Sequence, residues 1–153
     1  MKCRACDTPI EPFMSFGKMP LANGFLTADE VPNEKFYDLA PAVCGTCGLF
    51  QIMEQPMPDH MFHAQYPYYT SNSVYMQKHF EDFAKTIKPG FTVELGCNDG
   101  TMLRHFIGQN HLGIEPAANV AKVAQDRGCD VINKFFDSNL AKEIVSSRGY
   151  ADT

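Results

Sequence analysis

The sequence lacks three features that would each indicate a particular class of partner. It has no excess of positive charge, because 18 acidic residues outnumber 13 basic ones and give a net charge of −5. It has no apolar run near the roughly 18 residues that a membrane-spanning helix needs. Its first residues, MKCRACDTPI, contain no apolar segment of a secretory signal. We therefore expect a cytoplasmic protein that binds neither nucleic acid nor a membrane.

Two cysteine pairs stand in the first third of the sequence. Cys3 and Cys6 form one C-x-x-C pair, and Cys44 and Cys47 form another, with residues 7–43 between them. Paired cysteines in a cytoplasmic chain more often hold a metal than form disulfides. Four thiolates complete a tetrahedral zinc site and leave no position for a reactive water. We therefore predict a structural zinc site, with disulfide bonds or a redox-active pair as the alternatives.

Other cysteines and histidines are expected to lie outside this site. Cys97 and Cys129 stand alone in the second half of the chain and suit small buried positions. His60 and His63 could add metal ligands, but four cysteines already complete the coordination. Positions on a surface loop are therefore the expectation for both histidines.

The pattern of apolar residues changes near residue 73. The preceding residues, rich in Pro, Phe and Met, predict short strands and turns, followed by an aromatic loop over 56–72. Beyond residue 73, helical spacing of apolar residues predicts helices over 73–88, from 102, from 117 and after 137. The runs FTVELG, HLGIE and DVIN predict the strands between them. This alternation indicates parallel βαβ units, and the closing GYADT is expected to begin a fourth strand of a longer protein.

The stretch VELGCNDGTML joins the first of these strands to the helix that follows it. Gly96 and Gly100 mark a tight loop, but Asn98 and Thr101 stand where the dinucleotide fingerprint G-x-G-x-x-G needs glycine. This mismatch disfavours a nicotinamide cofactor. S-adenosylmethionine has no pyrophosphate and carries cationic groups, so its loop needs close backbone approach and nearby acids.

Three acids lie where they could serve such a ligand. Glu94 stands near the end of the strand before the loop, and Asp99 lies within the loop. Glu115 ends the next strand, at the spacing of about 20 residues at which an acid accepts hydrogen bonds from ribose hydroxyls. Pro116 ends that strand and presents the carboxylate at its tip. The pattern favours S-adenosylmethionine.

These motifs resemble those of a known enzyme family along nearly all 153 residues. VELGCNDGTML and GIEP resemble motifs of class I S-adenosylmethionine-dependent methyltransferases. CRAC…PLANGFL…CGTCGLFQ resembles the zinc-binding domain that precedes this core in sugar C-methyltransferases. The resemblance implies an α/β fold: a small β-rich zinc-binding domain with an aromatic linker over residues 1–70, then a partial Rossmann-like parallel βαβ unit over 71–153. It implies methylation of a nucleotide-linked keto-deoxysugar, in deoxysugar biosynthesis.

The resemblance also assigns residues to sites. The implied cofactor loop consists of Glu94, Gly96, Asn98, Asp99 and Gly100. Glu115 and Pro116 match the ribose acid and its neighbour, and Phe136 is an implied adenine contact. Candidates for the substrate side are Tyr68, Tyr69, Tyr75 and His79, which could instead simply pack the joint between domains.

The family's catalytic-base region has no counterpart in these residues, so the resemblance implies that this chain alone is inactive. Two other functions remain open at this point: a zinc-binding interaction module without catalytic activity, and a fragment of an NAD-dependent oxidoreductase. The sequence carries no signal for an oligomeric state.

Overall fold

The computed structural model describes residues 1–22 and 24–153, so Asn23 of the PLANGFL motif lies outside the described residues. The chain divides into two compact units, Met1–Met61 and Phe62–Thr153. None of the described helices is both long enough and apolar enough to cross a membrane.

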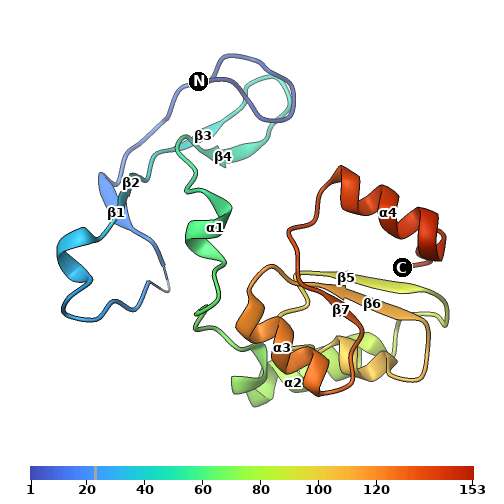
Figure 1. Cartoon of the computed structure of the whole chain (residues 1–153). Coiled ribbons are helices and arrows are strands. Elements are labelled where there is room, and N and C mark those ends of the chain that lie inside the picture. Colours follow the sequence, from blue (N-terminus) through green and yellow to red (C-terminus); the bar gives the residue numbers. More distant parts are fainter. Residues whose placement is uncertain (23) are drawn as a thin grey trace. The chain divides into compact units, whose positions relative to one another are not determined.

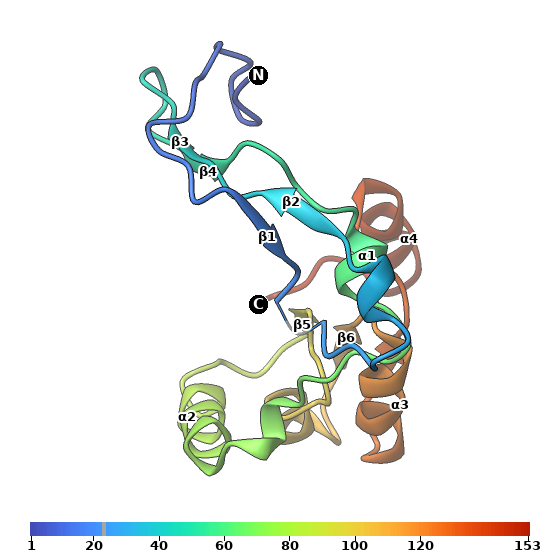
Figure 2. The same ribbon diagram turned by 90° about the vertical axis from the view of Figure 1, so that its left-hand side faces the viewer.

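The first unit contains two small antiparallel sheets, which Figures 1 and 2 show as two short ribbons. One sheet pairs β1 (Lys18–Pro20) with β2 (Phe36–Asp38), and the other pairs β3 (Pro41–Val43) with β4 (Phe50–Ile52). The 3₁₀ turn η1 (Val31–Asn33) lies between β1 and β2, and the short helix α1 (Pro58–Met61) follows β4. The predicted β-rich N-terminal region is confirmed.

The first unit has a thin apolar core. Its buried cluster consists of Cys3, Ile10, Ala42 and Cys44, with Met53 packed against it. Two of these four buried residues are cysteines. Because so small a core offsets little of the entropy lost on folding, cross-linking by a metal is the expected source of the unit's stability.

The second unit is built on three parallel strands in the order β5-β6-β7. These strands are β5 (Thr92–Leu95), β6 (His111–Ile114) and β7 (Val131–Ile132). The helices are α2 (Val74–Ala84), α3 (Ala118–Asp126) and α4 (Ser138–Arg148), with 3₁₀ turns η2 (Thr70–Asn72) and η3 (Leu103–Phe106). This is the predicted parallel βαβ pattern, consistent with a partial Rossmann-like unit.

Both faces of this sheet are covered, as a parallel sheet requires. Figure 1 shows α4 on one side of the sheet, with α2 and α3 on the other. Leu112 and Ile114 of β6 pack against Leu140 and Ile144 of α4. On the opposite face, Gly113 leaves room for the loop after β5, because a Cβ there would lie 2.5 Å from the Cys97 sulfur.

Local signals in the sequence fix the helix ends. The Ser73 side chain accepts a hydrogen bond from the Met76 amide at the start of α2, and Asp137 accepts from two amides at the start of α4. Gly149 closes α4 with a φ of 86°. The helix expected over 73–88 ends at Ala84, earlier than predicted.

The helix predicted from residue 102 is wrong in type, because the structure has only the 3₁₀ turn η3. The chain must turn again at Gly108, where φ is 89°, to enter β6 at His111. Of the apolar residues that suggested a helix, Met102, Leu103 and Phe106 are buried, while Ile107 is exposed.

The predicted fourth strand is not formed, but the last residues make backbone hydrogen bonds to residues 91 and 93. No strand is assigned over residues 149–153, but Asp152 donates its amide to the Phe91 carbonyl at 2.9 Å. The Val93 amide donates to the Thr153 carbonyl, also at 2.9 Å. These bonds place the last two residues beside β5, on the edge that β6 does not occupy.

Candidate functional site

The two cysteine pairs sit in equivalent turns. In each turn the amide four residues after the first cysteine donates to that cysteine's carbonyl, at 3.0 Å for Cys3 and 2.9 Å for Cys44. The donating residues, Asp7 and Gly48, both have positive φ, at 57° and 75°. This shared geometry turns both cysteines of each pair toward one point.

The four sulfur atoms of Cys3, Cys6, Cys44 and Cys47 lie within 4.8 Å of one another. The sulfurs of Cys3 and Cys47 are 3.6 Å apart, and those of Cys6 and Cys44 are 3.5 Å apart. Tetrahedral zinc with Zn–S bonds of about 2.3 Å requires separations of about 3.8 Å. Disulfide sulfurs would be only about 2 Å apart. The cluster therefore fits zinc, and all six cysteines are free thiols.

Hydrogen-bond donors surround the sulfur of Cys3. The Ala5 amide and the Gln51 side-chain amide lie 3.5 Å and 3.3 Å from it. The hydrogen bond from the Ala5 amide is the main reason that the pKa of Cys3 is lowered to about 6, and the bond from Gln51 adds to it. Burial of the thiol acts in the opposite direction. Zinc binds the thiolate, so these donors favour the form that the metal requires.

Gln51 is a site residue that the motifs did not indicate. It is buried on β4, with 5% of its surface exposed, and its side-chain oxygen accepts a hydrogen bond from the Arg4 amide at 3.2 Å. Alternation along the strand points the other way, because apolar Phe50 and Ile52 would be expected inward and Gln51 outward. In the structure Gln51 faces inward and Phe50 is exposed, so the sequence carries no signal for this residue.

The two histidines near this region have other partners. His60 lies 2.9 Å from the Tyr37 hydroxyl through Nδ1 and 3.1 Å from the Lys35 ammonium through Nε2. Nδ1 of His63 accepts a hydrogen bond from the Gln65 amide. Within residues 1–22 and 24–153, only the four cysteines form a cluster with metal-ligand geometry.

In the second unit, the glycine loop folds back onto the end of β6. The amides of Gly96 and Cys97 donate to the Ile114 carbonyl at 2.8 Å and 3.2 Å. Gly100 has a φ of 74°, and a Cβ there would lie 3.0 Å from both the Ala124 Cβ and the Cys129 sulfur. Glycine is thus required at residue 100 by conformation and by close packing on α3.

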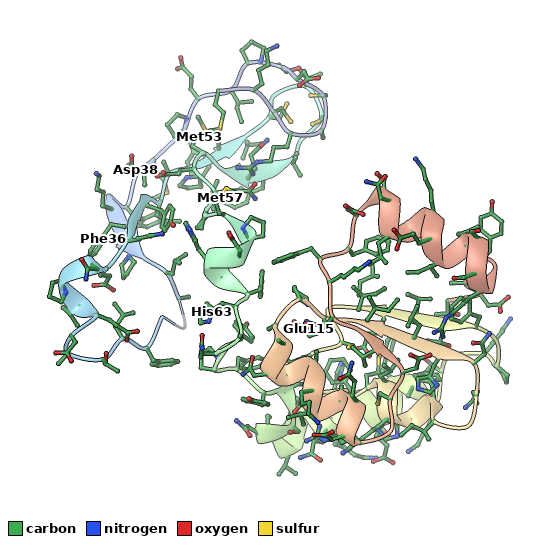
Figure 3. The ribbon with its side chains drawn as sticks, in the orientation of Figure 1. Phe36, Asp38, Met53, Met57, His63 and Glu115 are labelled. Carbon is green, nitrogen blue, oxygen red and sulfur yellow. The ribbon has the colours of Figure 1, made fainter. Side chains whose placement is uncertain are left out.

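Glu115 ties the glycine loop to the start of α3. Glu115 is buried, and its carboxylate accepts hydrogen bonds from the amides of Asn98 and Ala117, both at 2.9 Å. Figure 3 labels Glu115 where β6 leads into α3. The side-chain nitrogen of Asn133 donates hydrogen bonds to the carbonyls of Glu115 and Pro116, at 2.7 Å and 2.9 Å. The acid and its proline neighbour are therefore held rigidly beside the loop.

Glu94 has an incomplete set of hydrogen bonds. Its Oε2 is buried and has no hydrogen-bond partner in the described part of the chain. Burial is the main reason that the pKa of Glu94 is raised to about 8, and the charges of Asp99 and Glu115 raise it further. A hydrogen bond from the Leu103 amide partly lowers it. An acid with one buried, unpartnered oxygen is a group that a cationic ligand would stabilise in its charged form.

Asn98 and Asp99 bind the aromatic segment that precedes α2. Asn98 accepts from the Thr70 amide at 2.9 Å and donates to the Tyr68 carbonyl at 3.1 Å. Asp99 is fully buried and accepts from the Ser71 amide at 3.1 Å. Burial alone would raise the pKa of Asp99, but hydrogen bonds from Ser71 and Thr101 and the nearby Arg127 charge hold it low.

The substrate-side candidates fall into two groups. Tyr68 and Tyr69 lie on the segment bound by the glycine loop, with Tyr68 47% exposed. Tyr75 and His79 lie on α2 instead, where the His79 ring stacks on Phe83 with 6.5 Å between ring centroids. The structure brings only the first pair to the loop.

Phe136 lies on the α4 side of the sheet. It lines an apolar cavity of about 250 Å³ together with Val93, Leu95 and residues of α4. Its assignment as an adenine contact stays a prediction.

Comparisons with known proteins agree with both parts of this description. Residues 3–62 match a family described as "Putative zinc binding domain", a range that includes all four clustered cysteines. The chain is also similar to the C-methyltransferase NovU of Streptomyces niveus, with 32% identity over 98% of its own length. The chain spans 38% of the length of that relative. The family match covers the turns with the clustered cysteines, and the wider similarity to a C-methyltransferase continues through the glycine loop, so both units of the chain resemble parts of such an enzyme.

Proposed function

We propose that this chain is the zinc-binding and methyl-donor-binding part of an S-adenosylmethionine-dependent C-methyltransferase that acts on a nucleotide-linked keto-deoxysugar. The carboxyl of Glu94 beside the glycine loop carries the proposal, because its buried Oε2 has no hydrogen-bond partner in the described residues. A site for an anionic pyrophosphate would not place three carboxyl groups, those of Glu94, Asp99 and Glu115, around its loop. A site for a cationic methyl donor would.

Each part of the loop has a task in this proposal. Gly96 and Gly100 let the backbone turn closely enough to approach the donor. Glu94 offers negative charge to its cationic groups, and Glu115 has lone pairs left for ribose hydroxyls after its two bonds to amides. When bound, S-adenosylmethionine supplies an electrophilic methyl group to a carbon nucleophile of the substrate.

The zinc site takes no part in that chemistry. Its four thiolates fill the tetrahedral coordination, so no position is left for water or substrate. The metal would instead fix the fold of the first unit. The nucleotide-sugar substrate rests on the resemblance of the motifs, together with the relative's description as a C-methyltransferase.

Calorimetric titration of the purified chain with S-adenosylhomocysteine, and separately with NAD, tests the donor. We expect heat of binding with S-adenosylhomocysteine and none with NAD. Glu115→Gln should weaken the binding at least about tenfold. The variant replaces a charge-assisted hydrogen bond to ribose with a neutral one, and because the NH₂ group of glutamine cannot accept a hydrogen bond, the amides of Asn98 and Ala117 are no longer both bonded. The matched variant Glu143→Gln, on the exposed surface of α4, should bind like the wild type. Binding of NAD without S-adenosylhomocysteine would overturn the proposal.

A further inference from the structure

Residues 66–72, which we name the linker strap, are held by side chains of the second unit. Asn119 accepts the Tyr66 amide at 3.2 Å and donates to the Tyr66 carbonyl at 2.7 Å. Asn98 binds the Thr70 amide and the Tyr68 carbonyl in the same way. Two asparagine side chains thus complete main-chain hydrogen bonds that a helix or strand would otherwise make.

A second set of bonds anchors the other end of the strap. The Ser71 amide donates to Asp99, and the Ser71 carbonyl accepts from the Gln77 side chain at 2.8 Å. Arg127 donates to the Ser71 hydroxyl at 3.0 Å and to the Asp99 carbonyl at 2.6 Å. The strap is therefore fixed to the glycine loop at its C-terminal end and to α3 at its N-terminal end.

Besides its two hydrogen bonds to the main chain of Tyr66, Asn119 makes a third bond to a side chain of the strap. Its side-chain nitrogen also donates to the Tyr69 hydroxyl at 2.9 Å. All three of its side-chain hydrogen bonds go to the strap, and none goes to its own helix. Asparagine is a poor helix former, so its presence as the second residue of α3 is explained by the strap and not by the helix.

The position of Asn119 links the strap to the acid of the proposed donor site. Glu115 accepts the amide of Ala117, which sets where α3 begins, and Asn119 follows two residues later. The same short segment therefore presents Glu115 to the glycine loop and Asn119 to the strap. Movement of the strap would shift Tyr68 and Tyr69 relative to that loop.

We propose that Asn119 is a positioning residue of the methyl-donor site. It fixes the linker strap against the glycine loop, so that the strap, with Tyr68 and Tyr69, forms a preordered wall of the site. This inference rests on the proposed function, because it assigns the loop to the methyl donor. A preordered wall saves the ordering cost that a mobile segment would impose on ligand binding.

The test compares Asn119→Ala with Asn139→Ala in the whole chain. Asn139 is the second residue of α4, as Asn119 is of α3, but it is exposed and its side chain makes no hydrogen bond within the described residues. Two further variants remove fewer of the contacts between Asn119 and the strap. Asn119→Asp keeps the acceptor for the Tyr66 amide and loses the donors, while Tyr69→Phe removes one hydroxyl.

Two measurements are made on each variant: amide hydrogen exchange along the chain, and affinity for S-adenosylhomocysteine by calorimetry. In Asn119→Ala we expect exchange at Tyr66 to accelerate at least about tenfold, with β6 amides unchanged. Affinity should fall about five- to tenfold through the loss of three hydrogen bonds. Asn119→Asp and Tyr69→Phe should show smaller losses, and Asn139→Ala should match the wild type.

The outcomes separate this inference from the proposed function. If the wild type binds S-adenosylhomocysteine and Asn119→Ala binds it equally well, Asn119 does not position the site. Unchanged exchange at Tyr66 in that variant would overturn the inference as well. Exchange that accelerates equally in β6 would show a general structural role only. A wild type that binds no S-adenosylhomocysteine overturns the proposed function itself.

Discussion

At the scale of single residues, Glu94 has a buried oxygen, Oε2, without a hydrogen-bond partner in the described residues. Carboxyl groups are seldom buried without a full set of hydrogen bonds, because the charged form loses its hydration. Two nearby carboxyl groups, Asp99 and Glu115, add to that cost. A residue that weakens the fold in this way is expected where a ligand compensates for it.

This arrangement gives a prediction for the pH dependence of stability. The pKa of Glu94 is about 8 in the folded chain against 4.5 for an unperturbed group. Between these values the folded chain holds a proton that the unfolded chain has released, so stability should fall as pH rises. Glu94→Gln removes this dependence. Between about pH 5 and pH 8, the free energy of unfolding of this variant should therefore rise relative to that of the wild type by about 3 to 4 kcal/mol.

Denaturant unfolding of both chains at a series of pH values, at constant zinc, measures this difference. Taking the difference between the two chains cancels the contribution of all other titrating groups. The matched variant Glu143→Gln should follow the wild type at every pH. A constant difference between Glu94→Gln and the wild type would show that Glu94 titrates normally.

At the scale of elements, short-range signals were sufficient for most of the second unit. Helical spacing of apolar residues predicted α2, α3 and α4, because helix formation is decided largely within a few residues. The 3₁₀ turn η3 was not predicted, because its length is set by where β6 must begin. Contacts such as that of Asn119 with Tyr66 join residues 53 positions apart, and no local pattern reports them.

The turns that carry the cysteines depend on a similar long-range contact. Gln51 comes from β4, 48 residues after the cysteine whose sulfur it contacts. Gln51→Leu would keep the bulk of the side chain and remove the donor to Cys3. We expect zinc affinity about ten- to hundredfold weaker, as for other groups that orient metal ligands.

Competition with a chromophoric chelator measures that affinity. The matched variant Gln55→Leu, at an exposed position of the same region, should bind zinc like the wild type. Equal affinity for Gln51→Leu and Gln55→Leu would show that the buried amide only fills space.

At the scale of the whole molecule, the two units have separate cores of different kinds. The buried cluster of the first unit contains two of the four zinc ligands, Cys3 and Cys44. The second unit has apolar clusters on both faces of its sheet, formed by its own residues alone. The cysteine spacing and the βαβ pattern predicted this difference, because each arises from a strong and separate sequence signal.

Removal of zinc should therefore unfold one unit and spare the other. In excess chelator we expect amide protection to be lost around Cys3 and Ile10, while Leu112 of β6 keeps its slow exchange. Cys47→Ala should reproduce the effect without chelator, because three ligands bind zinc far more weakly than four. Cys129→Ala is the opposite control, because Cys129 lies in the core of the second unit and is not a zinc ligand. This variant should retain about one zinc per chain and lower the stability of the second unit only. Loss of protection at Leu112 on zinc removal would contradict this, since it would mean that the metal stabilises the glycine loop and its sheet as well as its own turns.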